Sequence, residues 1–78
     1  MSEVREMTYG EKAVGLTFNP SNDAAVANCK KEFAAVIDRM NLLRMMSAEP
    51  EIKRLASVAI TESQTAQMWA VKAITWKA

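Results

Sequence analysis

The C-terminal part of the chain contains nothing that would break a helix. After Pro50 there is no further proline and no glycine as far as Ala78, and small or apolar residues recur at intervals of three and four. Such spacing places them on one face of an α-helix. Proline itself is tolerated in a first helical turn. The pattern therefore predicts one long helix over residues 50–76, roughly 40 Å in length at ~1.5 Å per residue.

Two neighbouring stripes of residues run along this predicted helix. The first, here called the tryptophan stripe, consists of Ile52, Leu55, Ala59, Glu62, Ala66, Trp69, Ala73 and Trp76. The second, the glutamine stripe, consists of Ala56, Ile60, Ser63, Gln67, Ala70 and Ile74. One stripe can pack on another helix of the same chain, which leaves the other for a neighbouring subunit. Because a chain of 78 residues has little interior in which to bury two tryptophans, we expect copies of the same protein to cover them.

A second long helix is predicted over residues 22–46. It begins after Asn19, which precedes a proline and is therefore biased away from the helical region. Asn22 and Asp23 are favoured helix caps. The apolar residues that follow have an a/d pattern over nearly three heptads: Val26, Cys29, Phe33, Val36, Met40 and Leu43. The segment Ser47–Pro50 ends this helix, so the two long helices are expected to form a hairpin.

The N-terminal part predicts a short helix over residues 3–14, with Ser2 as its cap. Gly10 lowers the helix propensity there by ~1 kcal/mol relative to alanine. Residues 1–78 are thus predicted to form one all-α domain, a short helix followed by the hairpin. For so small a unit, burial at ~25 cal/mol per Å² barely offsets the chain entropy. We therefore expect the helices to assemble into a homo-oligomer.

Charge and hydropathy exclude several classes of function. The net charge is +1, so no basic face for long nucleic acid is expected. No run approaches the ~18 apolar residues of a membrane span, and the acidic, polar start is unlike a signal peptide. Cytosolic residence is therefore expected. Cys29 is the only cysteine, which excludes an intrachain disulfide, and we interpret it as a small buried hydrophobe.

The residue types of common catalytic sites are also missing. The chain has no histidine, no thiolate or imidazole cluster for a metal, and neither a phosphate-binding loop nor a dinucleotide-binding glycine turn. We therefore expect no catalytic residue, no metal and no cofactor, and interpret the protein as a non-enzyme. Thr61 and Glu62 interrupt the apolar pattern of the last helix. Glu62 marks either a central cavity or subunit contact, or a face exposed by drift in the heptad register.

The candidate binding residues are aromatic and cationic side chains in the N-terminal half. Aromatic faces and cations are what a nucleotide requires, the first for base stacking and the second for charge-assisted hydrogen bonds to phosphate. A second interpretation stays open, in which Tyr9 is a surface contact, Phe18 fills the core and the lysines form a solvated face. The candidates are Arg5, Tyr9, Lys12, Phe18, Lys30 and Lys31.

Several segments together resemble the phage anti-CBASS cyclic-nucleotide sponges. The resemblance covers roughly residues 14–76 and is most specific in the closing Met-Trp-Ala-Val-Lys-Ala segment, residues 68–73. The segments that carry it are Phe18–Asn22, Val26, Lys30, Ile37–Asp38, Ala59–Thr61 and Ala66–Thr75.

The resemblance implies a small all-helical protein that assembles as a hexamer in the cytoplasm of the infected bacterial host. Members of this family bind cyclic dinucleotides such as 3′,3′-cGAMP, and some bind cyclic trinucleotides. They hold the messenger without cleaving it, so that downstream effectors are not triggered. A cyclic dinucleotide has two bases and two phosphates around an approximate two-fold axis. A two-fold interface between subunits can supply one aromatic ring and one cation from each copy.

The resemblance also implies roles for individual residues. Tyr9 would stack on a base, and Lys30 would meet phosphate, with Lys31 adjacent and Arg5 or Lys12 as a further cation. The spacing from Tyr9 to Lys30 is longer than in the family, so Phe18 is the alternative stacking residue.

A residue of the last helix bears on the choice between dinucleotides and trinucleotides. Thr61 corresponds to the threonine of that helix in the family and is a further candidate ligand contact. The arginine that some members carry before this threonine is Ile60 here, which argues against trinucleotide binding. Two rival functions remain: a helical-hairpin adaptor that binds another protein, and, more distantly, a nuclease of the messenger.

Overall fold

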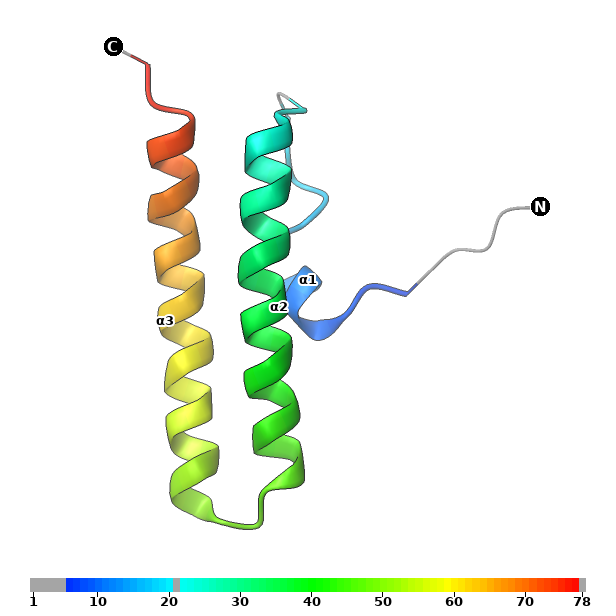
Figure 1. Cartoon of the computed structure of the whole chain (residues 1–78), viewed down its shortest axis with the longest axis vertical. Coiled ribbons are helices and arrows are strands. Elements are labelled where there is room, and N and C mark those ends of the chain that lie inside the picture. The colour runs from blue at the N-terminus through cyan, green and yellow to red at the C-terminus, as the bar shows by residue number, and fades with distance from the viewer. Residues whose placement is uncertain (1–5, 21, 78) are drawn as a thin grey trace, which may run out of the picture.

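The computed structural model describes residues 6–20 and 22–77. These residues form three helices, α1 (Tyr9–Ala13), α2 (Ala24–Met46) and α3 (Pro50–Ile74). The helices α2 and α3 lie side by side and antiparallel, joined by a short turn at one end, and α1 packs on α2 (Figure 1). The described part of the chain has no strand. The prediction of an all-α hairpin preceded by a short helix is therefore confirmed.

Side-chain caps fix where the two long helices begin. Asp23 accepts a hydrogen bond from the amide of Ala25 at 2.8 Å and so caps α2. Asn19 holds this cap in place, because its amide group exchanges hydrogen bonds with the backbone of Asp23 at 2.9 and 3.2 Å. Pro50 stands in the first turn of α3, as expected. The end of α3 differs from the prediction: the helix stops at Ile74, and Trp76 lies beyond it.

The helix α1 is shorter than predicted. It begins at Tyr9 and not at residue 3, because Thr8 is its N-cap. Thr8 and Glu11 form a reciprocal capping box, with hydrogen bonds of 3.1 and 2.9 Å between side chains and backbone amides. Glu6 and Met7 are not helical. The expected cap Ser2 lies outside the described residues.

Gly10 allows α1 to approach α2 closely. A Cβ atom on this residue would lie 2.2 Å from the carbonyl oxygen of Ala34, which no side chain tolerates. The Gly10 amide donates a 2.7 Å hydrogen bond to the carboxylate of Asp38 on α2. The residue that weakened the helix prediction is therefore the one on which the docking of α1 depends.

The core lies between the three helices and consists of Val14, Ala34, Ile37 and Ile60. On α2 the buried residues are Val26, Lys30, Ala34 and Ile37. The predicted a/d seam is thus rotated, since Val36 and Leu43 are 48% and 44% exposed. The physical reason is the position of α1, which covers the side of α2 next to that seam through Gly10 and Asp38.

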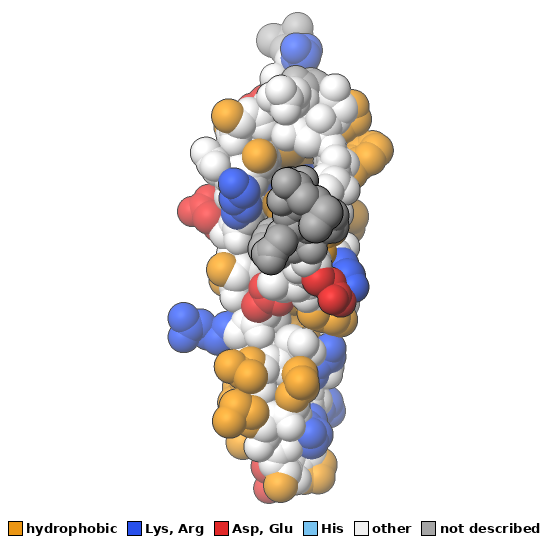
Figure 2. All heavy atoms as spheres, turned by 90° about the vertical axis from the view of Figure 1, so that its right-hand side faces the viewer, with side chains coloured by type: hydrophobic (Ala, Val, Ile, Leu, Met, Phe, Trp, Pro, Cys, Tyr) orange, Lys and Arg blue, Asp and Glu red, His pale blue; other side chains and the backbone are white. Residues whose placement is uncertain are grey.

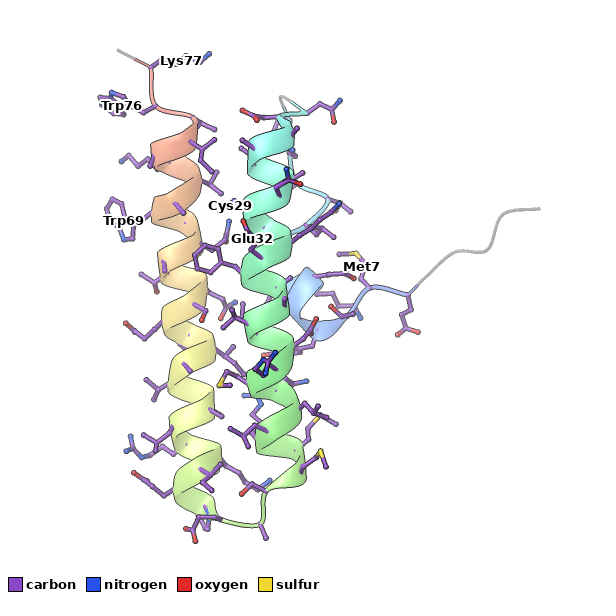
Figure 3. All side chains as sticks on the ribbon, in the orientation of Figure 1. Met7, Cys29, Glu32, Trp69, Trp76 and Lys77 are labelled. Atoms are coloured by element: carbon purple, nitrogen blue, oxygen red, sulfur yellow. The ribbon has the colours of Figure 1, made fainter. Side chains whose placement is uncertain are left out.

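The glutamine stripe of α3 faces α2, because its members Ala56, Ile60 and Gln67 are buried. The tryptophan stripe is left in solvent, with Trp69 and Trp76 65% and 71% exposed. Both indole rings point away from α2 (Figure 3).

Further apolar side chains gather toward the hairpin turn, on the lower half of the face in Figure 2. The exposed large apolar residues at that end of α2 include Leu42, Met45 and Met46. No helix in the described ranges has both the length and the apolar character needed to cross a bilayer.

Candidate functional site

A groove of about 540 Å³ opens where the end of α1 and the connection after it meet α2 and α3. Its size is in the usual range for small-ligand sites. Three of the predicted site residues line it, namely Lys12, Phe18 and Lys30. The full lining comprises Lys12, Ala13, Val14, Gly15, Phe18, Lys30, Gln67, Met68 and Val71.

Lys30 is buried beneath the groove, with only 5% of its surface exposed. Its ammonium group donates to the carbonyl oxygen of Gly15 at 2.9 Å and to that of Phe18. It also lies 5.5 Å from the centroid of the Phe18 ring, a cation–π distance. A buried charge is costly unless it is paired in this way. Lys30 therefore fastens the connection between α1 and α2 to the side of α2.

Phe18 stands at the edge of the groove with 71% of its surface exposed. The sequence left open whether it fills the core or stacks on a ligand, and its exposure excludes the first interpretation for this protomer. Lys30 donates a hydrogen bond to the backbone carbonyl of Phe18 and makes a cation–π contact with its ring. The connection thus presents an aromatic ring to solvent beside a cation, which suits a stacked base.

Tyr9 lies away from this groove. Its ring is 45% exposed, and the guanidinium carbon of Arg44 lies 5.3 Å from the ring centroid. Arg44 also donates to Asn41 at 3.0 Å and to Ser57 on α3 at 3.1 Å. Arg44 is 14 residues beyond Lys30 on α2, which corresponds to ~21 Å along the helix axis. Within one protomer, Tyr9 therefore does not line the groove that Phe18 borders.

The other predicted residues also differ in whether they line the groove. Lys12 is exposed and lines the groove, whereas Lys31 is exposed on α2 and does not line it. Thr61 is exposed on α3 outside the groove, and its carbonyl accepts a 3.2 Å hydrogen bond from the Thr65 hydroxyl. Arg5 lies outside the described residues.

Two residues of interest were missed by the sequence reasoning. Nothing in the local sequence marks Arg44, since its contact with Tyr9 depends on how α1 lies across α2. Gln67 did carry a signal, because it is the one long polar side chain in the glutamine stripe, whose other members are small or apolar. It is 6% exposed and lines the groove.

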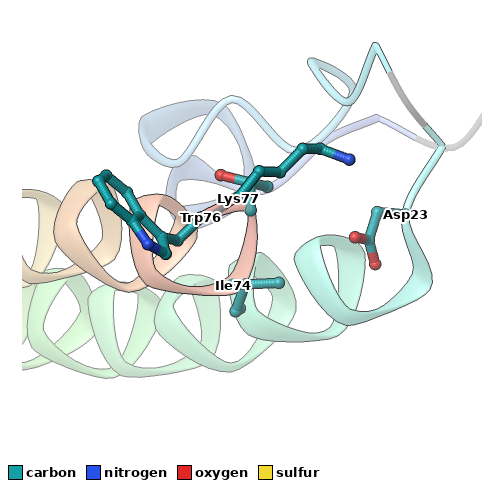
Figure 4. A pocket seen from close by; sticks show the side chains of 5 residues that line it. Asp23, Ile74, Trp76 and Lys77 are labelled. Carbon is teal, nitrogen blue, oxygen red and sulfur yellow. The ribbon is translucent and has the colours of Figure 1, made fainter.

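A second hollow, of about 310 Å³, lies at the open end of the hairpin. Asp23, Ile74, Trp76 and Lys77 border it (Figure 4). The Asp23 carboxylate already caps α2, and none of the predicted site residues borders this hollow. We therefore place the candidate site in the groove.

An ion pair in the first turns of α3 lies far from the groove. Glu51 and Arg54 share hydrogen bonds of 2.8 and 2.7 Å between carboxylate and guanidinium. These bonds lower the pKa of Glu51 and raise the pKa of Arg54. Both side chains are well exposed, so the pair adds little to stability. Within the described ranges, no group of three or more His, Cys, Asp or Glu residues could hold a metal ion.

The family described as Acb2/Tad1, hairpin domain, matches residues 11–75 of the chain. The match begins inside α1, includes every residue that lines the groove and ends one residue after α3. Tyr9 lies just outside it. Comparison with curated proteins and with solved structures gives no significant match.

Proposed function

The chain belongs to the Acb2/Tad1 hairpin-domain family, and from this membership we propose that it binds cyclic dinucleotide messengers and sequesters them without cleaving them. It would thereby block CBASS-type anti-phage signalling in the cytoplasm of the infected host, as a phage immune-evasion protein. The observation that supports this function best is the groove, where an exposed Phe18 ring lies beside Lys12 and Lys30.

The groove offers each part of a nucleotide a suitable contact. The Phe18 ring can stack on a base, and Met68 and Val71 supply apolar area on the α3 side. Lys12 is exposed and can pair with phosphate. An ammonium group has three donors, and the two carbonyl contacts of Lys30 occupy two of them. Its third donor is left for phosphate, so Lys30 can hold the loop and the ligand together.

We further propose that the protein acts as a homo-hexamer. The exposed tryptophan stripe supports assembly, because single copies leave Trp69 and Trp76 in solvent. A two-fold interface between copies would also allow Tyr9 of one protomer to approach a ligand held in the groove of its partner. The separation of Tyr9 from the groove within one protomer is then compatible with the role that the sequence predicted for it.

Calorimetric titration of the purified, assembled protein with 3′,3′-cGAMP tests the proposal. We expect binding at micromolar ligand or below, and recovery of intact ligand after heat denaturation of the complex. Phe18→Ala should weaken binding by about tenfold or more, because base–aromatic stacking contributes ~1–3 kcal/mol. Lys31→Ala is the control, since Lys31 is exposed outside the groove. Cyclic trinucleotides should bind more weakly, because Ile60 stands where some members have arginine.

The exposed tryptophan stripe also favours a second function, a helical adaptor that binds another protein. The two functions are separable in the same titration. Absence of binding by an assembled sample would exclude dinucleotide sequestration and leave the adaptor. Recovery of linear or hydrolysed product would instead indicate a nuclease.

A further inference from the structure

Gln67 is a buried polar side chain without a hydrogen-bond partner among the described residues. It lies on the face of α3 that packs against α2, and only 6% of its surface is exposed. Each described side-chain nitrogen or oxygen that is fully buried has a partner. The Gln67 amide has none, so its nitrogen and oxygen must both reach solvent. Since Gln67 lines the groove, that solvent is the water of the groove.

Among the described residues that line the groove, Gln67 alone has an uncharged polar side chain. Lys12 and Lys30 are cations and suit phosphate, and Phe18 is an aromatic ring that suits a base face. None of these three can select adenine over guanine by hydrogen bonding, because a lysine only donates and therefore suits the two acceptors of guanine, and a phenyl ring does neither. An amide, which has an adjacent donor and acceptor, can make that distinction.

We propose that Gln67 reads the edge of a purine base in the groove and favours adenine over guanine. The adenine edge carries a donor at N6 beside an acceptor at N7, which the oxygen and nitrogen of a glutamine amide can pair with at once. On the same edge guanine carries two acceptors, O6 and N7, so the amide oxygen would face another acceptor. This inference rests on the proposed function, because it concerns a base held in the same groove.

The free protein supports a binding role for this residue over a structural one. A buried amide that bonds only to water does not hold the helices together, and an apolar side chain of equal size would pack there at least as well. Gln67→Met keeps the volume and removes both the donor and the acceptor. We expect the melting temperature of ligand-free Gln67→Met to equal or exceed that of the unchanged protein.

The test is a calorimetric comparison of cyclic di-AMP with cyclic di-GMP on the full, assembled protein. We expect the unchanged protein to bind cyclic di-AMP at least about tenfold more tightly, since a bidentate base contact discriminates by a factor of this order or more. Gln67→Met should bring the affinity ratio close to one, chiefly by weakening the binding of cyclic di-AMP. If Gln67→Met does not fold, Gln67→Leu should show the same loss of discrimination.

Gln64→Met is the matched control, because Gln64 is on the same helix but its amide donates to the Ala13 carbonyl at 3.4 Å and does not line the groove. It should keep the affinity ratio. A preference for guanine, equal binding of both ligands, or a ratio that Gln67→Met leaves unchanged would overturn the role of Gln67 while sequestration stands. Failure to bind either ligand while 3′,3′-cGAMP binds would overturn the role of Gln67 alone, and failure to bind all three would overturn both proposals.

Discussion

Lys30 combines a structural task with a position in the candidate site. Its ammonium group joins the carbonyls of Gly15 and Phe18 to α2 and lies against the Phe18 ring. A lysine in the second turn of a predicted helix looks like any solvated cation, and Lys31 beside it is one. The sequence could name Lys30 and Lys31 as candidate cations, and the resemblance implied that Lys30 is the one that meets phosphate. It could not predict the burial, which depends on how the connection between α1 and α2 folds back.

Replacing Lys30 should therefore affect stability as well as binding. We expect Lys30→Met to lower the free energy of unfolding by about 1–3 kcal/mol, because two partly buried carbonyl groups lose their donor. Urea denaturation at fixed protein concentration measures this change. Lys31→Met is the control and should stay within about 0.5 kcal/mol, since Lys31 is exposed. Equal stability of the two variants would show that the carbonyl contacts of Lys30 contribute nothing to the fold.

At the scale of the elements, the two long helices were predictable and the way they face each other was not. Helix spacing, the Asp23 cap of α2, the proline in the first turn of α3 and the absence of breakers fix where the two helices lie in the sequence. Either stripe of α3 could have packed inside on spacing alone. The structure buries Ala56, Ile60 and Gln67 of the glutamine stripe and leaves the bulky tryptophans of the other stripe outside.

The helix α1 shows the opposite case, in which a residue that weakens a helix makes a contact possible. We expect Gly10→Ala to lower the free energy of unfolding by about 1–3 kcal/mol, the usual cost of overpacking. This loss occurs although alanine has the higher helix propensity, because the new Cβ would meet the Ala34 carbonyl at 2.2 Å. Hydrogen exchange should show that the amides of α1 lose protection first.

Gly15→Ala provides the comparison for that variant. The added Cβ would meet nothing closer than 3.9 Å, but the backbone there has a φ of 63°. Its cost should be limited to the ~1–2 kcal/mol of a left-handed non-glycine residue, with protection of α1 retained. If Gly10→Ala left both stability and exchange unchanged, the close docking of α1 on α2 would be refuted.

At the scale of the whole molecule, two features of a single copy bear on the proposed assembly. Its aromatic candidates lie in separate places, Phe18 with Lys30 and Tyr9 with Arg44. Its tryptophan stripe is in solvent along the outer face of α3 (Figure 3). A symmetric assembly would resolve both, because it would bury the stripe and bring side chains of one copy to the groove of another. The small core predicted from the sequence led us to expect assembly. The number of subunits, by contrast, was implied only by the resemblance.

Trp69→Glu should therefore dissociate the proposed hexamer into smaller species. A carboxylate at this position cannot be buried without a partner, whereas the tryptophan that it replaces is 65% exposed in the single copy. Sedimentation velocity at several concentrations measures the change in mass, and the melting temperature should fall because assembly no longer stabilises the fold. Asn28→Glu adds the same charge at an exposed position of α2 and should leave the mass unchanged. If Trp69→Glu kept the full mass, the tryptophan stripe would be free in the assembly, and binding of a different protein there would become the better explanation for its exposure.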